Sequence, residues 1–234
     1  MPALIRYQTI SFIRSMTFIP PVFIYLAWIF ILYAYKNTPI LSSYGVSSIA
    51  LYFCMTWMMM AIGSLETESE KHILFTHLAG KKKYLIGKWL TAFICMLPLA
   101  LFAILYPLAA GSFHGEMTAG LLTMAIYSHS VFAIFGIIVG TLFTVTTLAM
   151  KKYAWLSAVF VLVVSLAAKP LVEAISVLKW LIWIFPPIFR VIGYMGDEDI
   201  IIVDQGFMID LLLVVLYLTV FLGLSIFLFI KKER

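Results

Sequence analysis

The run YGVSSIALYFCMTWMMMAIGSL, from Tyr44 to Leu65, contains no charged side chain. A helix needs about 20 predominantly apolar residues to cross roughly 30 Å of hydrocarbon, so this run is long enough to span a membrane. The composition of the chain agrees, because 64% of its 234 residues are hydrophobic, 12% are charged and the mean hydropathy is +1.07. Soluble domains carry about 25% charged residues. The composition therefore excludes a soluble globular domain and predicts an all-α membrane protein.

Similar apolar runs recur along the chain and predict six transmembrane helices. They cover residues 18–35, 44–65, 84–110, 117–150, 154–168 and 207–230. The fourth run contains Gly136 and Gly140, at the spacing of small residues that lets two helix backbones approach closely in lipid. Residues 1–16 are too short to span, and they mix apolar residues with Arg6 and Arg14. We expect an amphipathic helix at the membrane surface there.

The basic residues indicate an orientation. With six spans and a cytoplasmic N-terminus, most of them, including Lys81–Lys83 and Lys231–Lys232, lie in cytoplasmic segments. The acidic residues Asp197–Asp199 then lie outside, which satisfies the positive-inside rule. Both termini are therefore expected in the cytoplasm. Residues 171–189 are mostly apolar but broken by Pro186–Pro187, so we expect a re-entrant segment in the outer leaflet, covered by protein or facing water, within the outer stretch 170–206.

The residue patterns of enzymes and of ion-coupled transporters are missing. The stretch Gly80 to Trp89 has the wrong spacing for a phosphate-binding loop, so the chain is not expected to bind ATP itself. His72 and His77 are five residues apart without a Glu between them, unlike a zinc-protease motif. The central parts of the predicted spans lack Asp, Glu, Lys and Arg, which argues against an ion or proton relay. We expect no catalytic residue, cofactor or metal, and a driving force supplied by another protein.

Two further expectations concern the remaining polar residues. His129 lies in the fourth predicted span, where a hydrogen bond between helices is the expected role of its ring. The basic residues form short groups without interleaved exposed aromatic residues, so no nucleic-acid binding is expected.

The loop from Glu66 to Lys83 is acidic, then apolar, then basic. A helix starting near Thr67 would carry Glu68 and Glu70 in its first turn, where the helix dipole favours negative charge. Its apolar residues and one histidine are predicted to share one face: Ile73, Leu74, His77 and Leu78. That face can dock into a groove on a cytoplasmic partner. Alternatively, it packs on the ends of the protein's own spans.

This loop resembles the first cytoplasmic loop of ABC-2 type permeases, the membrane subunits of type 2 ABC transporters. In that family an acidic residue precedes an apolar helix, and the third span begins with an apolar stretch ending in Gly-Lys. Here Glu70–Lys71, Ile73–Leu78 and Leu85–Lys88 occupy those places. The chain departs from the family where Ala79 replaces a usual proline and Gly80–Lys82 replaces a Ser-Arg type turn. The predicted six-span plan is similar to the family over the whole chain.

The resemblance implies a single permease domain over residues 1–234. Within it lie an elbow helix (1–16), a cytoplasmic coupling loop (66–83) and an outer re-entrant segment and loop (170–206). It also implies a separate cytoplasmic ABC ATPase, which binds ATP and Mg, and a second permease that is either an identical copy or a related chain. The elbow residues Arg6 and Arg14 would lie beside the ATPase. The residues expected to couple to the ATPase are Glu66, Glu70, Ile73, Leu74, His77 and Leu78.

In this family the second and fifth spans line the translocation path. The implied path residues are Met55, Trp57, Met58, Met59, Trp155, Phe160 and Leu162. Flexible thioethers suit an adaptable apolar surface, although ordinary packing would use the same residues. A path without charges suits hydrophobic or amphipathic cargo, and short outer loops favour export. Peptides of the bacteriocin or toxin type are the leading hypothesis, with drugs or lipids as the alternative.

The outer segment leaves two interpretations open. Trp183, Pro186, Pro187 and Arg190 can form an outer gate, as re-entrant helices do in the family. Alternatively, the aromatic residues of this segment form an interfacial belt. A function of another class also remains, a membrane immunity or regulatory protein that transports nothing. In either case the expected location is the plasma membrane of a bacterium, among membrane lipids.

Overall fold

The computed structural model of the chain describes residues 1–78, 80–146, 148, 150–175, 177–196, 199–201 and 203–233. It is 79% helical, and no strand occurs among these residues. A 3₁₀ turn, Lys151–Tyr153, precedes α7. The helices are α1 (Pro2–Ser15), α2 (Ile19–Leu32), α3 (Ile40–Gly63), α4 (Glu68–His77), α5 (Lys81–Ala110), α6 (Ala119–Thr144), α7 (Ala154–Leu166), α8 (Ala168–Ala174), α9 (Leu178–Ile182), α10 (Ile188–Ile192) and α11 (Gln205–Lys232).

By length and composition, four of the described helices can cross a membrane: α3, α5, α6 and α11. Two bent pairs raise the number to as many as six, α1 with α2 at 78° and α7 with α8 at 70°. The predicted runs 18–35 and 154–168 are shorter as helices, since α2 and α7 rise only about 21 Å and about 20 Å. The arrangement is that of an all-helical, multi-pass membrane protein.

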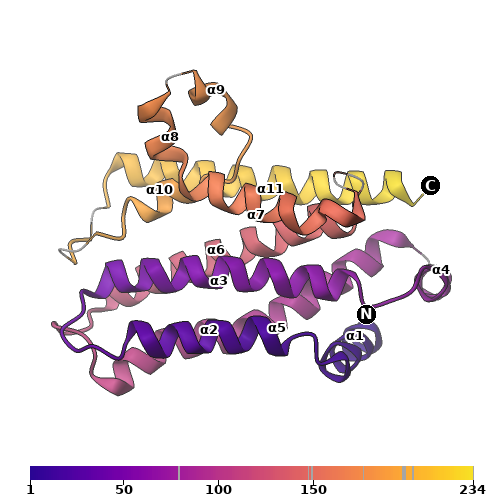
Figure 1. Cartoon of the computed structure of the whole chain (residues 1–234), viewed down its shortest axis with the longest axis horizontal. Coiled ribbons are helices and arrows are strands. Elements are labelled where there is room, and N and C mark those ends of the chain that lie inside the picture. The colour runs from indigo at the N-terminus through magenta and orange to yellow at the C-terminus, as the bar shows by residue number, and fades with distance from the viewer. Residues whose placement is uncertain are drawn as a thin grey trace.

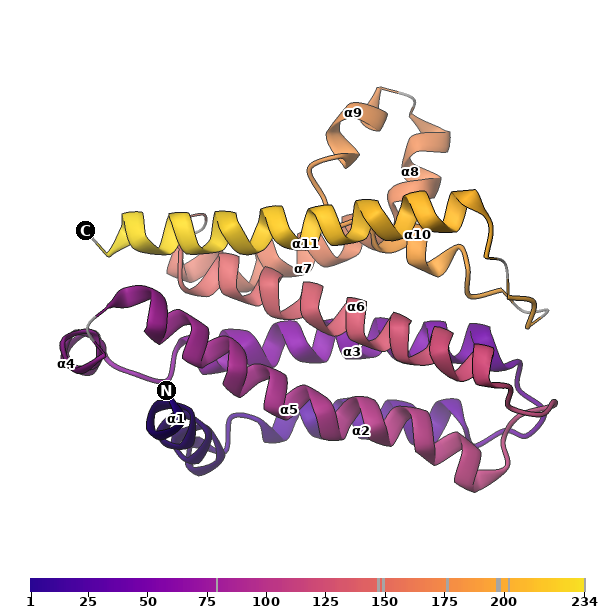
Figure 2. The same cartoon turned by 180° about the vertical axis from the view of Figure 1, so that it is seen from behind.

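The helices form three layers (Figure 1). The middle layer holds α3 and α6, with α2 and α5 on one side and α7 and α11 on the other. Figure 2 shows the same order from behind, with α1, α4 and both ends of the chain gathered at one end of the bundle. We call this the α4 end. The pair α8 and α9 projects away from the layers.

Two glycines of α6 allow a close contact between α6 and α3. A Cβ atom on Gly136 would stand 2.7 Å from the carbonyl oxygen of Tyr52, and one on Gly140 would stand 2.7 Å from that of Thr56. The hydroxyl of Thr56 donates to the carbonyl of Gly136 at 3.2 Å. Any larger side chain would push α3 and α6 apart, so the predicted close approach at these glycines is confirmed.

His129 lies fully buried between the same two helices. Its Nε2 is 3.0 Å from the hydroxyl of Ser47 on α3, and its Nδ1 is 2.8 Å from the carbonyl of Ala125. The predicted role of His129, a hydrogen bond between helices, is confirmed.

The end of the bundle opposite α4 is held together by loops. The backbone N–H of Thr38 donates to the carbonyl of Ser112, which joins two loops. Asp199 accepts hydrogen bonds from the first two N–H groups of α3, at Ile40 (2.9 Å) and Leu41 (2.6 Å). A distant loop thus caps α3, because those N–H groups have no partner within the helix. The neighbouring Asp197 and Glu198 of the predicted acidic run lie outside the described residues.

Candidate functional site

The short helix α4 begins with a complete capping box. Thr67 accepts the N–H of Glu70, and the Glu70 carboxylate accepts the N–H of Thr67 at 2.8 Å. These bonds to the backbone and hydroxyl of Thr67 lower the pKa of Glu70. Glu68 and Glu70 both lie in the first turn, where the helix dipole stabilises negative charge. The predicted start of this helix near Thr67 is confirmed. The capping box stabilises α4 as a helix through its own residues, in addition to its contacts with the bundle.

One side of α4 faces the bundle. The ring of Phe75 is buried and meets the rings of Tyr84 (centroids 5.1 Å apart) and Phe229 (6.1 Å) edge to face. Leu74 and Leu78 are half-buried beside it and pack on the same cluster. Aromatic rings in this arrangement add to the stability that burial gives. The bundle therefore holds α4 through the side that carries Phe75.

The other side of α4 is exposed. Ile73 lies near its centre with 58% of its surface accessible, and Glu70 and His77 flank it one helical turn away in either direction. The prediction that Ile73 shares a face with Leu74 and Leu78 is wrong. The helix is turned so that Phe75 points inward, which leaves Ile73 pointing away from the bundle.

Glu66, just before α4, lies inside the protein. Its carboxylate pairs with Lys88 at 2.5 Å, and both side chains are almost completely buried. The hydroxyl of Tyr84 donates to the same carboxylate at 2.9 Å, and the amide of Gln8 reaches its other oxygen at 3.5 Å. Lys88 also donates to the carbonyl of Ile62. Glu66 thus joins α1, α3 and α5 beneath α4.

The helix α1 lies across α5 through Leu4, Gln8 and Phe12, which are buried at intervals of four residues. A Cβ atom on Gly87 of α5 would stand 2.4 Å from Leu4, so α1 approaches the α5 backbone closely. Arg6 and Arg14 are exposed on the remaining surface of α1.

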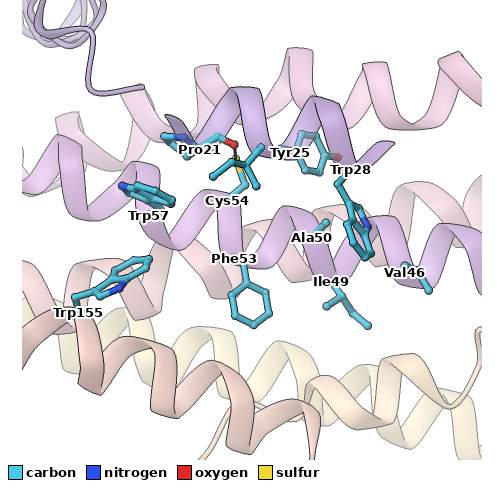
Figure 3. Close-up of a pocket in the computed structure, with 11 residues that line it drawn as sticks. Pro21, Tyr25, Trp28, Val46, Ile49, Ala50, Phe53, Cys54, Trp57 and Trp155 are labelled. Atoms are coloured by element: carbon cyan, nitrogen blue, oxygen red, sulfur yellow. Dashed lines mark hydrogen bonds between the residues drawn. The ribbon is translucent and has the colours of Figure 1, made fainter. Parts of the chain in front are cut away.

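An apolar groove of about 400 Å³ lies between α2, α3 and the start of α7 (Figure 3). Aromatic rings from all three helices line it, among them Trp28, Phe53, Trp57 and Trp155. The rings of Trp57 and Trp155 lie 5.4 Å apart, centroid to centroid. The groove can hold an apolar chain.

The structure divides the predicted path residues into two groups. Trp57 and Trp155 line the groove, and Phe160 is exposed farther along α7. The others are buried in helix contacts: Met55, Met58, Met59 and Leu162. Met55 and Met59 cover Gly136 and Gly140, which accounts for their burial. These four side chains therefore pack between helices, which was the alternative to their lining a translocation path.

The predicted gate residues lie around α9 and α10. Pro186 and Pro187 are buried, whereas the Trp183 side chain is exposed. The carbonyl of Trp183 accepts a hydrogen bond from Tyr217 of α11 at 2.7 Å. Arg190 forms an ion pair with Asp210 of α11.

Sequence reasoning missed the structural roles of several residues of these sites: Gln8, Phe75, Tyr84, Lys88, Asp210, Tyr217 and Phe229. Most lie in apolar runs or at helix ends and carry no motif. Lys88 was expected only to be a cytoplasmic charge and the Lys of the Gly-Lys end of the family motif. Among the described residues no group of three or more His, Cys, Asp or Glu side chains is placed to hold a metal ion. Comparison with models of known families, with curated proteins and with solved structures found no match.

Proposed function

We propose that the chain is the membrane-spanning permease subunit of an ATP-driven ABC exporter. The observation that carries this proposal is the placement of α4. A capped helix is attached to one end of an apolar bundle through Phe75, and its outer side, centred on Ile73, is left without a partner among the described residues. Such a helix is suited to dock into a groove on another protein.

The energy source would be a separate cytoplasmic ATPase that binds ATP and Mg. The sequence has no phosphate-binding loop. In the middle of the bundle the ring of His129 is buried and forms hydrogen bonds with Ser47 and Ala125. Lys88 is likewise paired with Glu66. Both groups are engaged in contacts between helices, and the proposal therefore assigns the driving force to ATP hydrolysis on a partner rather than to an ion or proton relay.

The proposal extends to the plan of the membrane. The proposed plan has six spans, in which α2 follows the surface helix α1 and α7 is continued by α8. It puts the α4 end in the cytoplasm together with both ends of the chain. Exposed Arg6 and Arg14 of α1 and the lysines around α5 and α11 lie at this end, as the positive-inside rule requires. The location would be the plasma membrane of a bacterium. A second permease, identical or related, would complete the transporter.

The groove supports hydrophobic or amphipathic cargo, with peptides of the bacteriocin or toxin type favoured over drugs or lipids. Trp57 and Trp155 present flat apolar surfaces to it. The variants Trp57→Ala and Trp155→Ala should reduce ATP-dependent uptake of a labelled amphipathic peptide into inside-out vesicles. Phe93→Ala, which changes an exposed ring of α5 that does not line the groove, should not. Equal uptake by all variants would contradict a path along this groove.

The docking role of α4 is tested by Ile73→Asp in a tagged chain purified from its native membrane. We expect loss of a co-purifying ATPase and of ATPase stimulation, because a charge at the centre of an apolar contact is desolvated without a partner. Ile73 is exposed, so the fold should not change. The controls are Ile73→Leu, which keeps an apolar side chain, and Tyr153→Asp, which adds a charge at an exposed position of the α4 end outside α4.

Retention of the ATPase by Ile73→Asp would contradict the docking surface. If the unaltered chain captures no ATPase but captures another membrane protein, the membrane immunity or regulatory function replaces the transporter.

A further inference from the structure

The helix α11 runs along the whole bundle and is lightly packed (Figure 2). It has 28 residues and rises about 42 Å. Only four of its residues are buried, Phe207, Val214, Ser225 and Phe229. Polar contacts near its two ends join it to segments that are far apart in the molecule.

At the α4 end, α11 holds α4. The Lys71 ammonium donates to the Glu233 carboxylate at 2.8 Å, and these side chains are only 12% and 5% exposed. Burial alone would lower the pKa of Lys71, but hydrogen bonds and charges from Glu233 and Glu68 raise it overall. Beside this pair the Phe75 ring meets the Phe229 ring, and Lys81 donates to the backbone carbonyl of Glu233. An ion pair and a ring contact thus fix α4 to the end of α11, and a further hydrogen bond joins the start of α5 to the same place.

Near its other end, α11 holds the outer segment. Asp210 pairs with Arg190 of α10 and accepts the hydroxyl of Tyr194 at 3.0 Å. About two turns farther along, Tyr217 donates to the carbonyl of Trp183 after α9. Residues 183–194 are therefore fastened to the same helix that holds α4.

The α4 contact borders open space. A cavity of about 580 Å³ opens between α4, α6, α7 and α11, and Lys71, Phe229 and Glu233 line it. The pair of Lys71 and Glu233 thus lies at the wall of a cavity.

We propose that α11 is a rigid link that carries a displacement of α4 to residues 183–194 at the opposite end. A hydrogen-bonded helix is a rigid element, and rigid secondary elements are among the structures that carry coupling between distant sites. The consequence for transport rests on the proposed function: docking of an ATPase on α4 would alter the outer segment through α11.

The link is tested by hydrogen exchange and mass spectrometry of the full chain in lipid nanodiscs, without any ATPase. Glu233→Gln removes the charge that holds α4, and Asp210→Asn weakens the opposite contact. We expect Glu233→Gln to speed amide exchange about tenfold in α4 and measurably in α10, because loss of a charge-assisted hydrogen bond makes local opening easier. Asp210→Asn should speed exchange in α10 and also in α4.

Two references make the result specific. Val220→Ala changes an exposed side chain in the middle of α11 and should leave both segments unchanged. Exchange in α6 should be the same in every variant; faster exchange there would indicate general loosening and count against a link. The proposal is overturned if amide exchange in α10 is unchanged in Glu233→Gln and amide exchange in α4 is unchanged in Asp210→Asn. This holds whatever each variant does to exchange in the segment next to its own substitution.

The outcome is separate from that of the proposed function. Coupled exchange in a chain that captures no ATPase would support the link and refute the transporter. An ATPase captured by a chain whose two segments exchange independently would support the transporter and refute the link.

Discussion

The buried pair of Glu66 and Lys88 predicts a measurable coupling energy. Both side chains are almost inaccessible, at 3% and 0% exposure, and the carboxylate also accepts the hydroxyl of Tyr84. Removing one partner of a buried ion pair costs about 3–5 kcal/mol, because the remaining charge is left in a medium of low polarity. We expect about 3 kcal/mol for Lys88→Met, since Tyr84 and Gln8 still donate to Glu66.

Glu66→Gln should cost a similar amount, because the buried ammonium of Lys88 then loses its opposite charge and keeps only neutral acceptors such as the carbonyl of Ile62. The double variant buries no charge, so it should cost about 2 kcal/mol less than the sum of the two single changes.

The assay is equilibrium unfolding of the purified chain in mixed micelles with increasing dodecyl sulfate, followed by far-ultraviolet circular dichroism. All four proteins of the cycle are measured under the same conditions. The conclusion that the pair is desolvated would be refuted if the single effects added to within about 0.5 kcal/mol of the double variant, as independent sites do. Single effects below about 1 kcal/mol would also refute it, since exposed ion pairs contribute that little.

Three further changes test other contacts. Gly140→Ala should destabilise the chain by about 1–3 kcal/mol in the same assay, because its Cβ would stand 2.7 Å from the Thr56 carbonyl; an unchanged midpoint would contradict the close contact of α3 and α6. Hydrogen bonds with Thr67 lower the pKa of Glu70 in the folded chain. The stability that Glu70 gives to the start of α4 should therefore be present above its unfolded pKa of about 4.3, and it should be lost as the pH falls through the lower pKa of the folded state. Exchange at the start of α4 should therefore quicken in acid, corrected for intrinsic rates, but not in Glu70→Gln. Asp199→Ala should speed exchange of the first amides of α3, because it removes their acceptor; equal rates would contradict the cap.

The features that the sequence predicted well depend on local spacing. A run of apolar residues must be helical in lipid, because each backbone N–H and C=O needs a partner within the segment. Thr67 followed by Glu70 marks a helix start by itself. Gly136 and Gly140 mark a close helix contact because only glycine lacks the atom that would obstruct it. None of these inferences requires knowledge of which helix lies opposite.

The orientation of α4 depends on residues that are distant in the sequence. Ile73, Leu74, Phe75 and Leu78 are all apolar, so periodicity alone allows more than one buried face. The buried face is decided by the ring of Phe229, which reaches α4 from the far end of the chain. An aromatic cluster of that kind outweighs the burial of one aliphatic side chain. The same reasoning applies to Met55 and Met59, whose surroundings are set by the glycines of α6.

The ion pairs of this chain could not be predicted by counting charges along the sequence. The positive-inside rule uses only the side of the membrane on which a charge lies. By that rule Lys88 is a cytoplasmic charge and Asp210 an outer one, yet the structure pairs Lys88 with Glu66 and Asp210 with Arg190. A charge near an apolar bundle needs such a partner, because desolvation without one is costly. In a chain with so few charges, each pair between helices constrains how those helices move. The proposed link through α11 rests on the pairs Lys71–Glu233 and Arg190–Asp210, and neither pair can be found without knowing which helices are neighbours.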